Sequence, residues 1–436
     1  MKERKNIYEI VYKWEKSNFF IDDLLAGKEL SDFSYRIVKG IVEKKLFLEH
    51  IIKSYLNRNV SKKTMVVLKI AFYELLFNDS SKNYATVNEA VDLTKNVSSN
   101  DKNLVNAVLR NFLRNDKNYK LPEDRKKYLS VKYSYPLSLV NILLKSYSLD
   151  RLDKLFKYFD NQNYLDIRVN TNLIKREDYI EKLKKENIHF RVSDKLLFHI
   201  RIMDDVKVSE LVGYNEGWFY IQDRAAQIIS QLMYPLKGDL LDIGSAPGGK
   251  LTFFSQINPK NFSLFAVESS KRRLKRLKKN INKLKSKNVK IINENFLNYE
   301  PKRKFKQIFL DPPCSGLGVI GKKADIKYRI TSNDIDSLKN LQKKLLCHAS
   351  SLVDNDGEII YSTCTLNKEE NETVIREFLK ENKNFKIKDI KNKKYLKNYL
   401  NNDTLKEQRI VKIYPPSDDM DGMFACVLKK EGVDGL

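Results

Sequence analysis

The sequence predicts a multidomain chain, in which an all-α N-terminal domain and a small α/β connector precede an α/β domain with a parallel, doubly wound sheet. The chain has 436 residues, more than one hydrophobic core usually supports. Apolar residues recur at helical spacing up to about residue 135. After about residue 226, apolar strands alternate with amphipathic helices. We therefore expect domains at residues 1–135, 136–225 and 226–436.

The first 135 residues show helical periodicity without a convincing strand, as in YRIVKGIVEKKLFLEHIIKSYL. The segments VLKIAFYELLF, YATVNEAVDLTK and LVNAVLRNFLR, within residues 67–114, resemble the NusB family of small helical RNA-binding and antitermination domains. This resemblance implies that the domain binds RNA. Core packing explains the apolar positions themselves, because they form the buried stripes of two helices. These positions are Val87, Ala90, Val91, Leu93, Val105, Val108, Leu109 and Phe112.

The remaining elements follow in order along the chain. In the connector, LDIRVNTN, HFRVSD and LLFHIRI are strand-like and REDYIEKLKKENI is helical. In the last domain, DLLDIG, LFAVES, KIINEN, QIFLDPP and GEIIYSTC are apolar strands separated by helical stretches, which predicts a parallel sheet. The last apolar segment, MFACVLKK, is expected to add an edge strand.

The charge balance favours a polyanionic partner. Lys and Arg number 81 against 56 Asp and Glu, which leaves a net charge of +25. An AT-biased genome, however, would also produce a chain rich in Lys, Asn, Ile and Tyr. The strongly basic stretch from Lys271 to Lys290 is open to two interpretations, a solvated helix face or a contact with the RNA backbone.

The cysteine pattern and the chain's hydropathy exclude several classes of protein. The four cysteines are scattered without paired short spacings, which argues against a disulfide framework or a zinc site, and we expect no metal. Cys347 and Cys426 lie in apolar periodic runs and are expected to be small buried hydrophobes. No apolar run is long enough for a membrane helix, and the charged start is unlike a secretory signal, so we expect a cytoplasmic protein.

A glycine-rich turn links the first strand of the α/β domain to a helix. It runs LDIGSAPGGK from Leu241 to Lys250, at the sheet edge where open α/β proteins bind ligands. Its glycines let backbone amides approach a ligand closely. A phosphate-binding P-loop would need Ser or Thr directly after Lys250, where the chain has Leu251. Glu268 ends the next strand, where a carboxylate can accept both ribose hydroxyls of a nucleoside, and Asn295 follows the third strand, within reach of an adenine edge.

Two later segments each place a cysteine just past an apolar strand. They are DPPCSGLG, with Cys314, and YSTCT, with Cys364, and both end at the edge that carries the glycine-rich turn. Two thiols are therefore expected to face one cleft. Carbon 5 of cytosine is a poor nucleophile, and adding a thiolate to carbon 6 makes carbon 5 able to accept a methyl group. A second acid/base group must then assist loss of the carbon 5 proton, and a second cysteine can serve.

These segments and the glycine-rich turn resemble the NOL1/NOP2/Sun family of RNA cytosine-5 methyltransferases over about residues 160–430. The resemblance implies a Rossmann-like class I methyltransferase domain, with Cys364 as nucleophile and Cys314 assisting product release. It also implies that Asp311 holds the cytosine and lies near the cofactor. The residues implied to hold S-adenosylmethionine are Gly244, Ser245, Ala246, Pro247, Gly248, Gly249, Lys250, Glu268, Asn295 and Asp311. Further matches are Lys323, Asp325, Lys327, Gln342, Glu369, Glu370, Asn371 and the DGMF segment from Asp421.

The chain departs from the family pattern at three places. The family turn is usually Cys-Ala-Ala-Pro-Gly-Gly-Lys-Thr, whereas this chain has Gly244-Ser245 and ends in Leu251. Asn295 stands where the family usually has Asp, and the His usual after the proline near residue 415 is absent. Small residues remain small in the turn, so we expect cofactor binding to survive.

A NusB-like domain in front of such a methyltransferase implies a bacterial enzyme that methylates a cytosine of 16S ribosomal RNA, free or in a partially assembled small subunit. We expect it to act as a monomer, with neither DNA nor membrane as partner. Other RNAs such as tRNA are an alternative substrate. DNA cytosine methyltransferases use a Pro-Cys segment, here Pro313-Cys314, but Cys364 and the lack of an obvious target-recognition insertion favour RNA. A non-catalytic rRNA-binding assembly factor would need neither cysteine.

Overall fold

The computed structural model describes residues 2–78, 82–162, 164–193, 196, 198–258, 262–390 and 410–432. It confirms the predicted fold class, with a helical N-terminal region followed by an α/β region. Contacts divide the chain into two compact units, residues 1–160 with 320–331, and residues 161–319 with 332–436. The division into domains at 135 and 225 stays a prediction.

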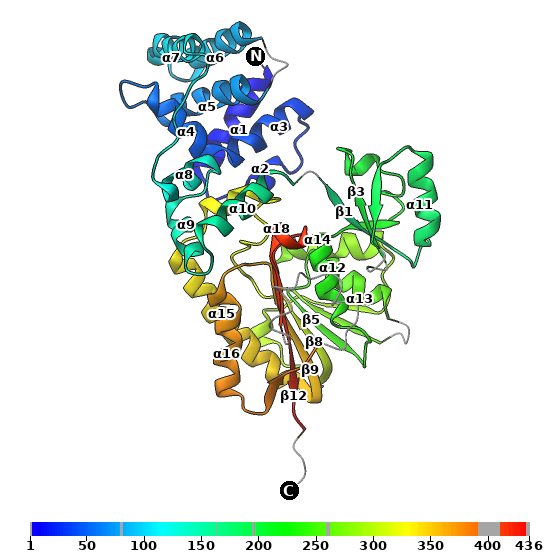
Figure 1. Ribbon diagram of the computed structural model, residues 1–436. Helices are drawn as coiled ribbons and strands as arrows, with labels where there is room; N and C mark the ends of the chain where they lie inside the picture. The colour runs from blue at the N-terminus through cyan, green and yellow to red at the C-terminus, as the bar shows by residue number, and fades with distance from the viewer. Residues whose placement is uncertain are drawn as a thin grey trace. The chain divides into compact units, whose positions relative to one another are not determined.

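The first unit is built from helices around one apolar core (Figure 1). The core draws on Val11, Ile41, Ile51, Phe72 and Phe112, all fully buried. Its α-helices are α1 (Lys2–Lys16), α2 (Ile21–Leu25), α3 (Asp32–Glu43), α4 (Lys45–Ser54), α5 (Lys62–Phe77), α6 (Asn83–Val97), α7 (Lys102–Arg114), α8 (Arg125–Lys132), α9 (Leu137–Leu144) and α10 (Leu149–Asp160).

The segment 320–331 folds as part of this helical unit, although it is distant from it in sequence. It contains three of the residues matched to the family motif. The Asp325 carboxylate accepts a hydrogen bond from the backbone N–H of Ile21 at 2.6 Å, and the Lys327 ammonium donates to the carbonyls of Glu43 and Tyr133 at 2.8 and 3.1 Å. Burial lowers the pKa of Lys327 to about 7. Asp325 and Lys327 therefore bind the helical unit through buried polar contacts.

The second unit begins with a four-stranded antiparallel sheet of order β2-β3-β1-β4. One helix, α11 (Arg176–Lys185), packs on it through the buried Tyr179 and Leu183. The strands are β1 (Leu165–Val169), β2 (Phe190–Val192), β3 (His199–Ile202) and β4 (Phe219–Ile221).

The main sheet of this unit has the order β10-β12-β9-β8-β5-β6-β7, with β11 also paired to β12. The strands β7, β6, β5, β8 and β9 run parallel, as predicted, and the C-terminal strands join antiparallel. The bounds are β5 (Leu240–Ile243), β6 (Leu264–Val267), β7 (Val289–Ile292), β8 (Phe305–Leu310), β9 (Val353–Thr363), β10 (Phe385–Ile387), β11 (Ile410–Ile413) and β12 (Met423–Lys430).

The predicted edge position of MFACVLKK is wrong. Strand β12 lies between β9 and β10, and six of its eight residues are buried. An all-apolar run is expected for a strand covered on both faces, and here the run forms part of the sheet interior. Cys426 on this strand is buried in the core, as predicted, while Cys347 is partly buried against it.

Helices cover both faces of the main sheet (Figure 1), and alternating strand residues belong to two apolar cores, one on each face. Leu240 of β5 faces the core shared with α12 (Arg224–Gln231), α13 (Gly249–Gln256) and α14 (Lys271–Lys283). Its neighbour Leu241 faces the opposite core, shared with α15 (Ser332–Leu352) and α16 (Glu372–Glu381). Helices on both faces leave only the strand ends open, so the carboxyl edge of the parallel strands is free for a site.

Candidate active site

The glycine-rich turn follows β5 at this edge. Gly244 has φ of +77°, and a Cβ there would lie 2.3 Å from the carbonyl oxygen of Asp311. Gly248 has φ of +107°, and α13 begins at the next residue. Only glycine accepts such backbone angles and so close an approach readily. The turn therefore brings the start of α13 close to the end of β8.

Two cavities lie on either side of this turn and share Gly244 and Asp311. The first, of about 270 Å³, is lined by Val267, Glu268, Asn295 and Phe296 among others. The Glu268 carboxylate is 4% exposed, accepts a hydrogen bond from the Ser270 backbone at 3.0 Å, and lies 3.2 Å from the Arg273 guanidinium. The Asn295 side chain lines the wall, where it accepts a hydrogen bond from the Leu297 backbone. An apolar slot with a carboxylate at one end suits a nucleoside.

The second cavity, of about 220 Å³, is lined by charged groups as well as by Tyr220 and Pro247. The Asp242 carboxyl is buried, its Oδ2 has no hydrogen-bond partner, and burial raises its pKa to about 7.

The Lys250 ammonium lies 2.5 Å from the Asp311 carboxylate. Burial acts to lower the pKa of Lys250, but the charges of Asp311 and Cys364 raise it above its usual value. Lys250 thus stays protonated between a carboxylate and a thiol.

The two cysteines come together as their strands predict. Cys314 follows β8 and Cys364 follows its parallel neighbour β9, and their sulfur atoms lie 3.3 Å apart. Both residues are partly exposed and neither forms a disulfide. The hydrogen bond with Cys364, burial, and the charges of Cys364, Glu370 and Asp311 together raise the pKa of Cys314 well above its usual value. At this separation the pair can share one proton between the two sulfurs.

Backbone contacts fix the loop that carries Cys314. Gly318 donates its N–H to the Cys364 carbonyl at 2.9 Å, and its own carbonyl accepts from Gly422 at 2.8 Å. A Cβ on Gly318 would lie 1.9 Å from the Gly422 oxygen. Asp421, the start of the matched DGMF segment, donates its backbone N–H to Asp223 at 3.1 Å. The Cys314 loop, the end of β9 and the 421–424 segment are therefore packed backbone to backbone.

Sequence reasoning missed Arg168, which is buried behind the glycine-rich turn. Its guanidinium donates to the Gly249 carbonyl and the Gln222 amide oxygen, both at 2.6 Å, and to the Thr252 hydroxyl at 2.7 Å. Burial lowers its pKa to about 9. A charged residue inside the strand-like run LDIRV was the available signal.

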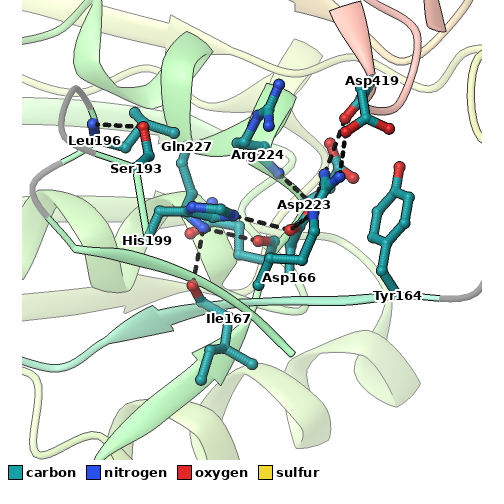
Figure 2. A network of polar contacts seen from close by, with 12 residues as sticks. Tyr164, Asp166, Ile167, Ser193, Leu196, His199, Asp223, Arg224, Gln227 and Asp419 are labelled. Atoms are coloured by element: carbon teal, nitrogen blue, oxygen red, sulfur yellow. Dashed lines mark hydrogen bonds and ion pairs between the residues drawn. The ribbon is translucent and has the colours of Figure 1, made fainter. Parts of the chain in front are cut away.

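A second network that the sequence did not reveal joins the small sheet to the loop before β12 (Figure 2). The Asp166 carboxylate accepts hydrogen bonds at 2.8 Å from both His199 and Arg201, and Arg201 also donates to the Asp419 carbonyl at 2.9 Å. Arg224 donates to the Asp418 carbonyl at 2.7 Å. Although burial acts to raise it, these bonds hold the pKa of Asp166 well below its usual range. The network holds the loop that leads into Gly422.

Within the described residues, no cluster of His, Cys, Asp or Glu could hold a metal ion. No helix in the described parts of the chain is long and apolar enough to cross a membrane.

Comparisons with known proteins agree with the two-part organisation. Residues 231–429 match a family model described as 16S rRNA methyltransferase RsmB/F, and residues 1–114 match the NusB family. Ribosomal RNA small subunit methyltransferase B of Proteus mirabilis is 31% identical over 341 residues, which cover 76% of this chain and 79% of that protein. The probable enzyme of the same name from Bacillus subtilis is 25% identical over 95% of both chains.

Solved structures share the fold. The crystal structure of PH0851 covers 97% of both chains with a TM-score of 0.79 at 24% identity. NSun6 from Pyrococcus horikoshii with SFG covers 71% of this chain and 98% of that chain, with a TM-score of 0.59 at 21% identity. The sequence matches confirm the resemblance predicted from the motifs, and the solved structures confirm the fold. The chain is a methyltransferase with a NusB domain, and it belongs to the RsmB/F family of 16S rRNA methyltransferases.

Proposed function

We propose that this protein transfers a methyl group from S-adenosylmethionine to carbon 5 of one cytosine in 16S ribosomal RNA. Cys364 acts as the covalent nucleophile and Cys314 assists release. The observation that carries the proposal is the 3.3 Å separation of the two sulfur atoms at the sheet edge that bears the glycine-rich turn.

The residues around the turn fit S-adenosylmethionine. Glu268 can accept the ribose hydroxyls at the end of the 270 Å³ cavity, and the apolar wall beside Asn295 suits the adenine. The unpartnered Oδ2 of Asp242 suits an ammonium group, because a buried carboxylate gains most from an opposite charge. When bound, the cofactor supplies a methyl group on a positively charged sulfur, an electrophile for carbon 5.

The cysteines divide the covalent work. Cys364 lies close enough to Lys250 for its charge to raise the pKa of that lysine, and the same attraction favours the thiolate of Cys364. The Cys364 sulfur forms a bond to carbon 6 of the cytosine, which gives carbon 5 the electron density to accept the methyl group. Asp311 lies beside Lys250 and lines both cavities, which supports its proposed role of holding the cytosine ring near the cofactor.

Release then requires loss of the carbon 5 proton. Once Cys364 is a thioether, its charge and its hydrogen bond no longer raise the pKa of Cys314. Burial and the charges of Glu370 and Asp311 still raise that pKa, but the largest cause is removed, so Cys314 gives its proton to solvent more readily. The Cys314 thiolate takes the proton from carbon 5, and the electron pair of that C–H bond forms the double bond to carbon 6. The bond between carbon 6 and the Cys364 sulfur breaks with its electrons on sulfur, which restores the nucleophile.

Four observations support RNA as the substrate. The relatives from Proteus mirabilis and Bacillus subtilis carry ribosomal RNA in their names, and the first 114 residues match the NusB family. The net charge is +25. Helix α14 exposes a row of cations while burying only Leu274 and Leu277. The exposed cations are Lys271, Arg272, Arg273, Lys275, Arg276, Lys278 and Lys279.

The test is to incubate the protein with radiolabelled S-adenosylmethionine and unmodified 16S RNA, both naked and in partially assembled small subunits. We expect label in one cytosine, mapped by bisulfite sequencing, and loss of label when that cytosine is changed to uracil. Label in tRNA alone would reassign the substrate. Cofactor binding without labelling of any RNA would instead favour a non-catalytic assembly factor.

A further inference from the structure

A cluster of buried polar side chains joins the two cysteine loops. The Glu370 carboxylate accepts hydrogen bonds from the Ser315 backbone N–H at 2.8 Å and from the Gln342 amide at 3.0 Å. Its other oxygen accepts from the Ser315 hydroxyl, which lies 2.7 Å from the Thr365 hydroxyl. Glu370, Gln342, Ser315 and Thr365 are 0 to 2% exposed. We call these four residues the Glu370 cluster.

Two residues of the Glu370 cluster are covalent neighbours of the two cysteines. Ser315 directly follows Cys314, and Thr365 directly follows Cys364. Gln342 also donates to the Pro313 carbonyl at 2.9 Å, so both residues that flank Cys314 are held. Adjacent Cα atoms are about 3.8 Å apart, so a shift of Ser315 or Thr365 moves the neighbouring cysteine with it.

Glu370 is itself held from a third side. The Tyr361 hydroxyl donates to the Glu370 carbonyl at 2.6 Å, and the next residue, Asn371, donates its side-chain amide to the Thr365 carbonyl at 3.0 Å. Each polar group facing the carboxylate can act as a donor, so the ionised side chain satisfies them together. A buried carboxylate with this many donors keeps a single orientation, because any other would leave a donor unpaired.

We propose that Glu370 is a positioning residue, which holds Ser315 and Thr365 together and so sets the separation of Cys314 and Cys364 that the release step needs. The inference rests on the proposed function. Glu370 is not a catalytic residue, because its side chain is fully buried and its carboxylate oxygens accept hydrogen bonds from Ser315 and Gln342. The pKa of Cys314 is raised mainly by the hydrogen bond with Cys364 and by burial. The negative charge of Glu370 makes a smaller contribution in the same direction.

The test uses Glu370→Ala and Glu370→Gln in the full chain. The alanine removes the cluster's acceptor, while the glutamine keeps the side-chain size and one acceptor oxygen but adds donors that face donors. Ser315→Ala removes one hydroxyl from the same cluster. The matched control is Glu358→Gln, a buried carboxylate in the middle of β9 that pairs with Lys237 and Lys388.

The readouts are the fraction of protein trapped on 16S RNA as a denaturation-resistant adduct, and the rate at which that adduct releases product. We expect the three cluster variants to accumulate adduct and release it at least tenfold more slowly than the parent. Their affinity for S-adenosylhomocysteine should stay within twofold. The Glu358→Gln control should show the same adduct fraction and the same release rate as the parent. Glu370→Gln and Ser315→Ala keep the test decisive if the alanine variant does not fold.

Release at the parent rate by folded Glu370→Gln and Ser315→Ala variants would overturn the inference. A lower methylation rate with an unchanged adduct fraction would also overturn it, because that result describes general loss of activity. If the parent forms no adduct and Cys364→Ala still methylates RNA, the proposed function fails on its own, whatever the Glu370 variants do.

Discussion

Arg168 donates a hydrogen bond to the backbone carbonyl of Gly249 at 2.6 Å. The arginine belongs to β1 of the small sheet, whereas the glycine begins the helix after the glycine-rich turn. A second bond from Arg168 reaches Thr252, one turn further along α13. The small sheet therefore supports the glycine-rich turn from behind.

Replacing Arg168 with Met should weaken cofactor binding about tenfold, which corresponds to ~1.4 kcal/mol. The reason is that charged hydrogen bonds to the turn are lost while much of the side-chain volume stays. Calorimetric titration with S-adenosylhomocysteine measures the effect. Arg191→Met, at an exposed position of β2, is the control and should bind like the parent. An unchanged affinity in a folded Arg168→Met protein would show that the turn needs no such support.

Asp242 should make the cofactor-free protein less stable as the pH rises from about 4 to about 7. Burial raises its pKa in the folded state to about 7, above the unfolded value, so the folded state binds more protons in this window. The free energy of unfolding then falls by up to about 1.4 kcal/mol per pH unit from this group. Melting temperatures at pH 5 and pH 7 should differ less in Asp242→Asn than in the parent. If the melting temperature changed equally between pH 5 and pH 7 in the parent and in Asp242→Asn, the raised pKa of Asp242 would be contradicted.

Gly318→Ala should disrupt the site, because the new methyl group would lie 1.9 Å from the Gly422 oxygen and 2.9 Å from the Cys364 oxygen. We expect a lower melting temperature and at least a tenfold loss of methylation. The matched substitution is Gly238→Ala, whose nearest neighbour beyond the adjoining residues is 3.6 Å away. That variant should change stability by no more than about 0.5 kcal/mol. Parent-like activity in Gly318→Ala would mean that the Cys314 loop, the end of β9 and the 421–424 segment are not closely packed.

Charge reversal on α14 tests its contact with RNA. The double variant Lys275→Glu and Lys279→Glu changes two exposed positions one helical turn apart. If both contact phosphates, affinity should fall at every salt concentration, and the slope of log affinity against log salt should decrease by about 1 to 2. Lys302→Glu with Lys304→Glu, also exposed, gives the same change in net charge before β8. Equal losses in the two double variants would favour a general charge effect.

Those parts of the fold and site that depend on local pattern could be predicted from the sequence. The glycine-rich turn and both cysteine segments follow apolar strands, and the carboxyl ends of parallel strands meet at one edge of a sheet. The amino-acid pattern alone was therefore enough to predict that Cys314 and Cys364 lie together. The edge position of MFACVLKK was wrong because pairing partners are not encoded in a strand's own periodicity.

Other features could not be predicted because they arise from contacts between distant segments. Arg168 reaches Gly249 across 81 positions, and Glu370 reaches Ser315 across 55. Glu370 could be matched to a motif, but its role depends on a buried donor set that only the folded chain assembles. The segment 320–331 has no helical periodicity that would assign it to the first unit. Its contacts there are hydrogen bonds of Asp325, Lys327 and Arg329 and the packing of Tyr328 on the apolar core.

The central claim, that Cys364 attacks the base and Cys314 releases it, is tested most directly by following methyl incorporation and denaturation-resistant protein–RNA adducts in Cys364→Ala and Cys314→Ala. Both reactions contain radiolabelled S-adenosylmethionine and unmodified 16S RNA. We predict that Cys364→Ala abolishes methylation and adducts, while Cys314→Ala traps a stable methylated adduct. Methylation by Cys364→Ala, or an adduct that depends on Cys314 instead, would contradict the account.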